Sequence, residues 1–406
     1  MFDTAHACLP LNRRSVLLGA SALLGTALAS PALGKGDVNS FVAGLWEDAR
    51  SRNVPRKIFD AALGKFRPVD SVVSLSRKQP EFVSTTADYI GKRITDRQAS
   101  IGRGKSQEWA QTLAAVEERY GVQAEIVLSV WGNETSYGSY MGGTKTPNAL
   151  ATLAWSGYRE QYFRNELLTA LEILAAGHVA PADMVGSWAG AMGHPQFMPT
   201  SFMAYAVDFR GDGHKDVWGS IPDALASTAN YLKENGWRAG ETWGYEVKLP
   251  KGFDYGQVWS RSTIPLSNWA AQGVGRSNGK AFPRGSDTAR VYMPMGGTGP
   301  VFLVLANFDV IKRYNNSDSY GLAVGHLADR ILGSGSFVSA WPDDTALNKA
   351  SRVELQQLLT RKGYQVGTPD GVIGSKTRAA VIDWQSRAGL LPDGHVGGKL
   401  LARIKG

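Results

Sequence analysis

One carboxylate stands at the end of a strongly apolar run. Residues 126–131 read Ile-Val-Leu-Ser-Val-Trp, and Glu134 follows within the box Gly-Asn-Glu-Thr-Ser-Tyr-Gly at 132–138. Burial of a lone carboxylate disfavours its charged form and raises its pKa. A glutamate with a raised pKa can act as a general acid that protonates a leaving oxygen near neutral pH. On this segment alone, an ordinary helix glutamate that is solvated or paired with a cation is the alternative.

Three further segments carry polar and aromatic side chains, at 187–200, 229–237 and 310–320. In the first, small residues allow the backbone to approach a polymer strand, and Gln196 offers both a donor and an acceptor. For each tyrosine in these segments core packing is the alternative, and for Gln196 and Asn315 it is helix or loop capping.

A possible cation loop begins at Asp208 and continues through residue 216. It resembles the start of an EF-hand, with carboxylates at positions one and five and glycine at six. Arg210 occupies a position that usually donates oxygen, and Gly219 stands where the closing glutamate is expected. The sequence therefore leaves two alternatives, a structural Ca²⁺ site and a plain Asp-Gly turn. The predicted ligands are Asp208, Asp212, His214 and Asp223. No cofactor is expected to be required for activity.

The composition indicates a globular protein. The 406 residues are 43% hydrophobic and 20% charged, with a net charge of +8, which is an ordinary globular composition. Because the lysines and arginines are scattered, the sequence does not predict nucleic-acid binding, and an anionic polymer is the expected partner. Cys8 is the only cysteine, which excludes an intramolecular disulfide and a cysteine metal cluster.

The first 34 residues predict an export signal. Arg13 and Arg14 precede an apolar run over 16–28, which is too short to span a bilayer comfortably, since that takes about 20 residues. Small residues follow, as at a cleavage site. The paired arginines favour the twin-arginine type, with a general secretory signal as the alternative. Cys8 precedes the apolar run and so cannot be a lipidated cysteine. We expect a soluble periplasmic protein without a transmembrane anchor after signal removal.

The rest of the chain predicts a mainly α (α+β) fold. Apolar residues recur at helical spacing over 38–129, and further helices are expected at 122–134, 158–176, 221–235 and 308–332. Residues 240–304 are rich in Gly, Pro, Ser and Thr with short apolar pieces, which predicts a small β-rich insertion. A Gly-Ser-Gly-Ser break follows at 333–336. It predicts a linker over 334–348 between a domain at 37–333 and a three-helix module at 349–406.

The tail contains two helical runs, each followed by a glycine turn and an Asp-Gly pair, at Asp370-Gly371 and Asp393-Gly394. Over its whole length this pattern resembles the bacterial peptidoglycan-binding domain at the ends of many cell-wall enzymes. That resemblance implies docking onto wall material. A helical cap without a ligand is the alternative.

Taken together, the Glu134 box and the three polar segments resemble the lytic murein transglycosylase B family. The match runs from about residue 41 to 328 and includes the segments 79–82 and 120–122. It implies a lysozyme-like helical catalytic domain with Glu134 as the sole acid and base. It also implies that Arg159 faces a peptide or lactyl carboxylate. The residues for which the resemblance implies contact with sugar are Tyr89, Ser187, Gln196, Tyr231, Tyr314, Asn315 and Tyr320.

The resemblance implies cleavage of the β-1,4 bond between N-acetylmuramic acid and N-acetylglucosamine in peptidoglycan glycan strands. The expected product carries a 1,6-anhydro end, formed without water. A muramidase-type hydrolase that uses the same Glu134 is one alternative, and a catalytically inactive wall-binding protein is another. Partners beyond the glycan are expected among the proteins of cell-wall synthesis or division.

Overall fold

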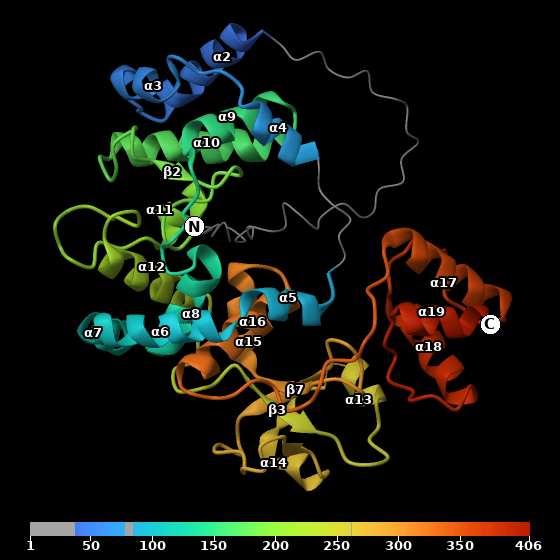
Figure 1. Cartoon of the computed structure of the whole chain (residues 1–406). Helices are drawn as coiled ribbons and strands as arrows, with labels where there is room; N and C mark the ends of the chain where they lie inside the picture. The colour runs from blue at the N-terminus through green and yellow to red at the C-terminus, as the bar shows by residue number, and fades with distance from the viewer. Residues whose placement is uncertain (1–36, 78–83, 261) are drawn as a thin grey trace, which may run out of the picture. The chain divides into compact units, whose positions relative to one another are not determined.

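The computed structural model describes residues 37–77, 84–260 and 262–406. The chain divides into two compact units (Figure 1). Of the described residues, the first unit comprises 37–77, 100–237 and 313–317, and the second comprises 84–99, 238–260, 262–312 and 318–406. The predicted export signal, Cys8 and the segment 79–82 lie outside the described residues.

The first unit is helical, as the apolar spacing predicts. Its central helix α8 is buried at every position from Ile126 to Gly132, and a helix that is apolar all round belongs in a core. Helices α9 and α10 pack side by side (Figure 1). Two short strands, β1 (Thr144–Lys145) and β2 (Val185–Gly186), pair antiparallel. The helices are α2 (Val38–Ser51), α3 (Arg56–Leu63), α4 (Asp70–Arg77), α6 (Asp96–Glu108, of which 96–99 belong to the second unit), α7 (Ala110–Tyr120), α8 (Ala124–Thr135), α9 (Thr146–Trp155), α10 (Glu160–Ala175), α11 (Pro199–Tyr205) and α12 (Ile221–Glu234).

Local sequence signals account for several helix ends. Helix α7 ends at Gly121, whose φ of 70° is the left-handed conformation that glycine adopts without penalty. Helix α12 begins after Ser220, whose side chain accepts the N–H of Asp223, and has proline in its first turn. The helices predicted at 122–134, 158–176 and 221–235 are thus confirmed with boundaries shifted by one or two residues.

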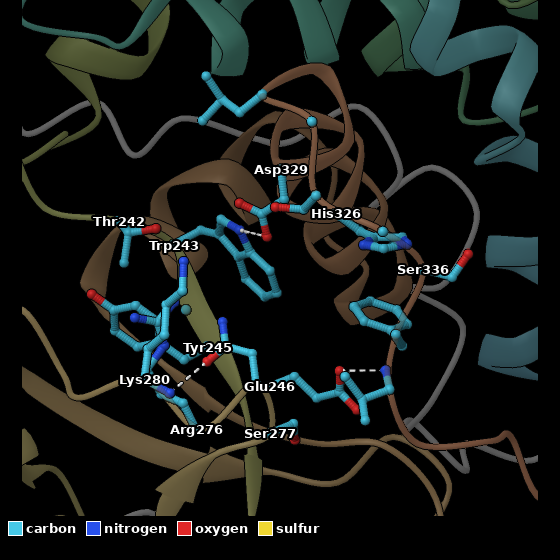
Figure 2. A pocket seen from close by; sticks show the side chains of 18 residues that line it. Thr242, Trp243, Tyr245, Glu246, Arg276, Ser277, Lys280, His326, Asp329 and Ser336 are labelled. Atoms are coloured by element: carbon cyan, nitrogen blue, oxygen red, sulfur yellow. Dashed lines mark hydrogen bonds between the residues drawn. The ribbon is translucent and has the colours of Figure 1, made fainter.

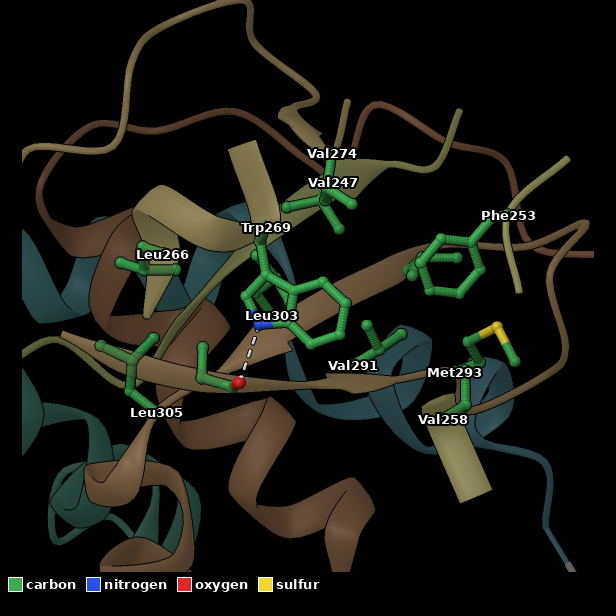
Figure 3. Packing of buried hydrophobic residues seen from close by; sticks show 12 residues of the cluster. Val247, Phe253, Val258, Leu266, Trp269, Val274, Val291, Met293, Leu303 and Leu305 are labelled. Carbon is green, nitrogen blue, oxygen red and sulfur yellow. Dashed lines mark hydrogen bonds between the residues drawn. The ribbon is translucent and has the colours of Figure 1, made fainter. Parts of the chain in front are cut away.

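The second unit holds the predicted β-rich insertion. Its five strands are all antiparallel in the order β4-β6-β7-β3-β5. Trp269 lies fully buried in the apolar cluster on the sheet, and its indole N–H donates to Ala289 O at 2.8 Å (Figure 3). A buried tryptophan needs such a partner for its single donor. The elements are α5 (Thr86–Arg93), β3 (Gly244–Lys248), α13 (Gly256–Trp259), β4 (Ile264–Pro265), α14 (Leu266–Ala271), β5 (Gly275–Arg276), β6 (Thr288–Tyr292) and β7 (Val301–Val304).

One helix prediction is wrong in detail. The segment 308–332 is expected to be a single helix, but it forms α15 (Ala306–Tyr314) and α16 (Asp318–Ile331). The break falls on Asn315-Asn316-Ser317. Asparagine and serine compete for backbone hydrogen bonds and disfavour helix interiors, and here Ser317 N bonds back to Asn315 O at 2.6 Å.

The tail forms the predicted three-helix module, with α17 (Lys349–Arg361), α18 (Ser375–Arg387) and α19 (Gly398–Lys405) around a small apolar core. Its two Asp-Gly turns are built alike. Gln356 Oε1 accepts the N–H of Gly371 at 2.7 Å, and Gln385 Oε1 accepts the N–H of Gly394 at 2.8 Å. Each glutamine amide also donates to the aspartate of its turn. Two buried glutamines therefore specify both loops.

Within the second unit the module contacts the β-rich insertion. The indole N–H of Trp259 donates to Asp393 O at 2.9 Å, and the guanidinium of Arg378 lies 3.7 Å from the centre of the Trp259 ring. The predicted linker is also fastened, because Glu246 accepts the N–H groups of Val338 and Ser339 at 2.8 Å each.

His326 in α16 makes stability depend on pH. Burial, followed by the positive charge of Arg330, lowers the pKa of its imidazole to about 3, and the ring stacks on Phe337 at 3.8 Å. The unfolded chain binds this proton below pH 6.5 and the folded chain does not, so stability is lost as pH falls from 6.5 towards 3.

We expect the unfolding free energy of the parent chain to fall by about 2 kcal/mol more between pH 7 and 5 than that of His326→Phe, which keeps a ring but cannot titrate. Urea unfolding of both proteins at the two pH values measures this difference. Equal pH dependence in the two proteins would contradict the buried neutral state.

Candidate functional site

Glu134 lies in the last turn of α8 and is half-buried. The helix ends in a run of three residues with positive φ, which are Ser136 at 49°, Tyr137 at 58° and Gly138 at 83°. Each non-glycine residue in this conformation costs free energy, and such residues cluster at functional sites. The Thr135 hydroxyl accepts the N–H of Gly138 at 3.1 Å and so closes the turn directly after the carboxylate.

His194 packs into this turn. A Cβ at position 138 would lie 2.4 Å from His194 Cε1, so only glycine fits there. His194 Nδ1 accepts the indole N–H of Trp131 at 3.0 Å. Burial lowers the pKa of His194, which favours the neutral ring that this acceptor role requires. Thr135 also hydrogen-bonds the carbonyl of His194. The 187–198 segment is thereby attached to the end of the helix that carries Glu134.

Gln196 folds this segment back on itself. Its φ is 51°, and its side-chain amide donates to Met141 O at 3.0 Å and Gly193 O at 2.9 Å. The amide nitrogen of Gln196 therefore caps loop carbonyls, which is the alternative role that the sequence left open for this residue. No donor among the described residues bonds to its amide oxygen, which remains an available acceptor. Ser187 accepts the N–H of Ala191 at 3.0 Å and shapes the start of the segment.

Tyr231 and Tyr314 support the segment from within the first unit. They are 7% and 1% exposed. The hydroxyl of Tyr314 donates to Pro195 O at 2.7 Å, and that of Tyr231 donates to Arg313 O at 2.6 Å. Both rings pack against Phe197. These two tyrosines follow the core-packing alternative in this structure, and their contact with sugar stays a prediction.

Buried polar atoms without partners occur on the predicted residues Arg159 and Asn315 and on Asn133, which was not predicted as a site residue. Arg159 has a φ of 47° and lays its guanidinium 4.4 Å from the centre of the Tyr162 ring. Among the described residues its Nη1 has no hydrogen-bond partner, and the same holds for the Oδ1 atoms of Asn315 and Asn133. A buried polar atom left unpaired costs about 1–3 kcal/mol. A bound substrate that pairs these atoms would recover that cost.

Tyr89 and Tyr320 belong to the second unit. Tyr320 is 1% exposed in α16. Tyr89 lies in α5 beneath the guanidinium of Arg93, and its buried hydroxyl has no partner in the described part of the chain. Their membership of the same site as Glu134 stays a prediction.

The predicted calcium ligands do not form a ligand cluster. Among residues 37–77, 84–260 and 262–406 no group of three or more His, Cys, Asp or Glu side chains could hold a metal ion. Asp208 accepts three backbone N–H groups of its own loop, and Asp223 accepts those of Phe209, Arg210 and Asp216. Asp212 pairs with Arg210 at 3.6 Å, and the His214 side chain is exposed. These contacts match the Asp-Gly turn alternative, and calcium binding stays a prediction.

Sequence reasoning missed Trp131, Thr135 and His194, which position the site without carrying an obvious chemical signal. Gly138 was the available clue, because a glycine just after a helix end often marks a close approach. Nothing in the spacing of Trp131 and His194 identifies them as partners.

Comparisons place these features among known proteins. Residues 37–329 match the family described as Transglycosylase SLT domain, and residues 348–404 match the Putative peptidoglycan binding domain. The chain is 33% identical over 292 residues to membrane-bound lytic murein transglycosylase B of Escherichia coli (strain K12), covering 68% of this chain and 78% of that one.

Two solved structures are similar as well. SltB3 from Pseudomonas aeruginosa, in complex with NAG-anhNAM-pentapeptide, is 42% identical with a TM-score of 0.84, covering 91% of this chain and 99% of that chain. Escherichia coli Slt35, in complex with calcium, is 30% identical with a TM-score of 0.60, covering 72% and 92%. In the described part of this chain, no helix combines the length and the apolar character needed to cross a membrane.

The Gly138 contact can be tested by substitution. In Gly138→Ala the new methyl group meets His194, and the left-handed φ adds strain of about 1–2 kcal/mol. We expect kcat to fall at least about tenfold, because a misplacement near 1 Å can cost about 100-fold. Gly104→Ala is the control, since a Cβ at that position on α6 would meet nothing within 4 Å. Activity assays and thermal unfolding compare the two, and an unchanged Gly138→Ala protein would contradict the contact.

Proposed function

The chain belongs to the transglycosylase SLT family and is a lytic transglycosylase acting on peptidoglycan, and we propose that Glu134 is its catalytic acid and base. The observation that carries this proposal is the placement of Glu134. It is a half-buried carboxylate at the end of a buried helix, directly before a strained turn that is hydrogen-bonded to the 187–198 segment.

The first step is protonation of the leaving oxygen. Glu134 donates its proton to the glycosidic oxygen between N-acetylmuramic acid and N-acetylglucosamine, and the C1–O bond breaks. Glycosidases ordinarily use two carboxylates, whereas the resembling motifs of this chain offer one. The N-acetyl group of the muramic residue replaces the second carboxylate by stabilising the oxocarbenium-like centre at C1.

The second step closes the ring. The carboxylate of Glu134 takes the proton from the C6 hydroxyl of the same muramic residue, and O6 forms a bond to C1. The product is a 1,6-anhydro end, Glu134 is protonated again, and no water is consumed. Because O6 and C1 belong to one sugar, the attack of O6 on C1 is intramolecular and competes with attack by water.

The remaining site residues bind and orient the strand. The free amide oxygen of Gln196 accepts from a sugar hydroxyl or N–H, while Ser187 and Asn315 add polar contacts. The unpaired Nη1 of Arg159 suits a peptide or lactyl carboxylate. Tyr231 and Tyr314 hold the backbone around Pro195 in place, and Tyr89 and Tyr320 are assigned to sugar contact from the resemblance.

We place the protein in the periplasm on the strength of its predicted export signal. The tail, which matches a peptidoglycan-binding family, would hold the enzyme on its polymer. Proteins of cell-wall synthesis or division are the proposed protein partners. The calcium complex of Slt35 supports a structural ion at Asp208, Asp212, His214 and Asp223. The hydrogen bonds of Asp208 and Asp223 argue against it, and no catalytic step is assigned to calcium.

Replacing Glu134 by glutamine tests the acid directly. Glu134→Gln keeps the size of the side chain but cannot donate or accept the proton, so we expect release of wall fragments from purified sacculi to fall by at least about 1,000-fold, near the upper part of what acid-base catalysis supplies. Sedimentation with sacculi should show unchanged binding. Turnover near that of the parent protein would refute the assigned role.

The identity of the attacking oxygen separates cyclisation from hydrolysis. We expect digestion in ¹⁸O-labelled water to yield anhydro ends without label, because O6 of the sugar is the nucleophile. Mass spectrometry of the released fragments measures the label. Labelled reducing ends at the new muramic termini would establish the muramidase-type alternative and leave Glu134 as the acid.

A further inference from the structure

The second unit contains a polar pocket that the glycan-cleaving residues do not use. Its volume is about 650 Å³, which lies within the range of small-ligand sites. Strand β3, the loop after β5, the C-terminal part of α16 and residues 332–338 line it. Figure 2 shows Arg276 and Lys280 together on one side of the pocket and His326 with Ser336 on the other.

The two cations in the pocket have no anionic partner. Within the described residues neither Arg276 nor Lys280 forms an ion pair. The side chain of Arg276 makes one hydrogen bond, from Nη1 to Ala281 O at 3.1 Å, so four of its five N–H donors remain. The Lys280 side chain is exposed and makes no hydrogen bond in the described part of the chain.

The acids of the pocket are already engaged. Glu246 accepts the N–H groups of Val338 and Ser339 at 2.8 Å. Asp329 accepts the indole N–H of Trp243 at 3.2 Å. His326 is buried and its pKa is lowered to about 3, so it carries no charge near neutral pH. Glu246 and Asp329 keep their negative charge, so the charges of the lining balance over the whole pocket. Their hydrogen bonds go to neutral N–H groups and not to Arg276 or Lys280, and the end of the pocket that holds these two cations is therefore where an anion would bind.

The covered ring of Tyr245 and the unpaired hydroxyl of Ser277 favour a small oxygen-rich ligand over a sugar ring. Tyr245 offers no open platform on the side of Arg276, whose guanidinium lies 4.7 Å from the ring centre, and Phe282 packs against the same ring at 5.5 Å. Ser277 is 9% exposed, and its Oγ has no partner among the described residues. Rotation about its Cα–Cβ bond gives this hydroxyl other staggered positions from which it can donate.

We propose that this pocket binds the carboxylate of a peptide. Two guanidinium N–H groups and the Lys280 ammonium would hold the two oxygens, and Ser277 would donate a further hydrogen bond. This inference rests on the proposed function in one respect, because peptidoglycan supplies such carboxylates on the peptides attached to its glycan. The pocket then binds the peptide, while the residues around Glu134 act on the sugar chain.

The binding test uses acetyl-D-Ala-D-Ala as the free acid and as its C-terminal amide. Isothermal titration is done on Arg159→Gln protein, so that the other predicted carboxylate contact is absent. We expect the amide to bind about tenfold more weakly than the acid. When Arg276→Gln and Lys280→Gln are added to this protein, we expect its affinity for the acid to fall by at least the same factor.

The matched control is Lys251→Gln, an exposed lysine of the same insertion that does not line the pocket. It should leave affinity unchanged, and equal melting temperatures would show that all variants are folded. Acid and amide binding alike, or acid binding unaffected by the paired substitution, would overturn the proposal.

Cleavage assays distinguish this inference from the proposed function. On glycan strands stripped of peptide, the Arg276→Gln and Lys280→Gln protein should match the parent rate. On peptide-bearing strands its KM should rise about tenfold, the factor expected in the titration and about 1.4 kcal/mol, with kcat unchanged. A parent protein that cleaves neither substrate would refute the proposed function, whereas equal KM values on peptide-bearing strands would refute the pocket alone.

Discussion

The absence of room for a side chain at Gly138 is the constraint on which the proposed site depends. The ring of His194 fills that space, and its Nδ1 is held by the indole of Trp131 one turn before the carboxylate. Thr135 joins the same two segments through its hydroxyl. Because these contacts converge on the residues that flank Glu134, they join the end of its helix to the Gln196 segment. A site built on a rigid helix end keeps the geometry that proton transfer requires.

The tail module and the proposed site differ in how the hydrogen bonds of selected buried polar groups are completed. In the tail module, Gln356 and Gln385 each bind the aspartate side chain and the glycine N–H of one Asp-Gly turn. In contrast, Arg159, Asn315 and Asn133 keep a buried atom without a partner in the described part of the chain. Native interiors pair their buried polar atoms almost completely. Arg159 and Asn315 belong to the proposed site, and a substrate group that pairs these atoms would stabilise the complex.

In the second unit, the charged residues of the pocket also differ in whether they have partners. The carboxylate of Glu246 fastens residues 338 and 339, and that of Asp329 accepts from Trp243. The Glu246 contacts hold the segment after α16 against the insertion. Neither acid pairs with Arg276 or Lys280 among the described residues, so the two cations stay at one end of the pocket without an ion-pair partner. The same hydrogen bonds thus secure the connection towards the tail and direct both acids away from the two cations.

The sequence by itself determined the mainly helical fold, the β-rich insertion and the three-helix tail, because apolar period and turn residues are local properties of the chain. It also singled out Glu134 as the proposed acid, which stays a prediction. It misjudged the 308–332 helix, where Asn315-Asn316-Ser317 outweigh the apolar spacing. Only the tertiary structure decided that Tyr231 and Tyr314 are buried supports, that the Asp208 loop turns its carboxylates onto its own backbone, and that His194 meets Gly138. Those outcomes depend on which groups from distant segments share one space and one set of hydrogen bonds, and no spacing along the chain encodes that.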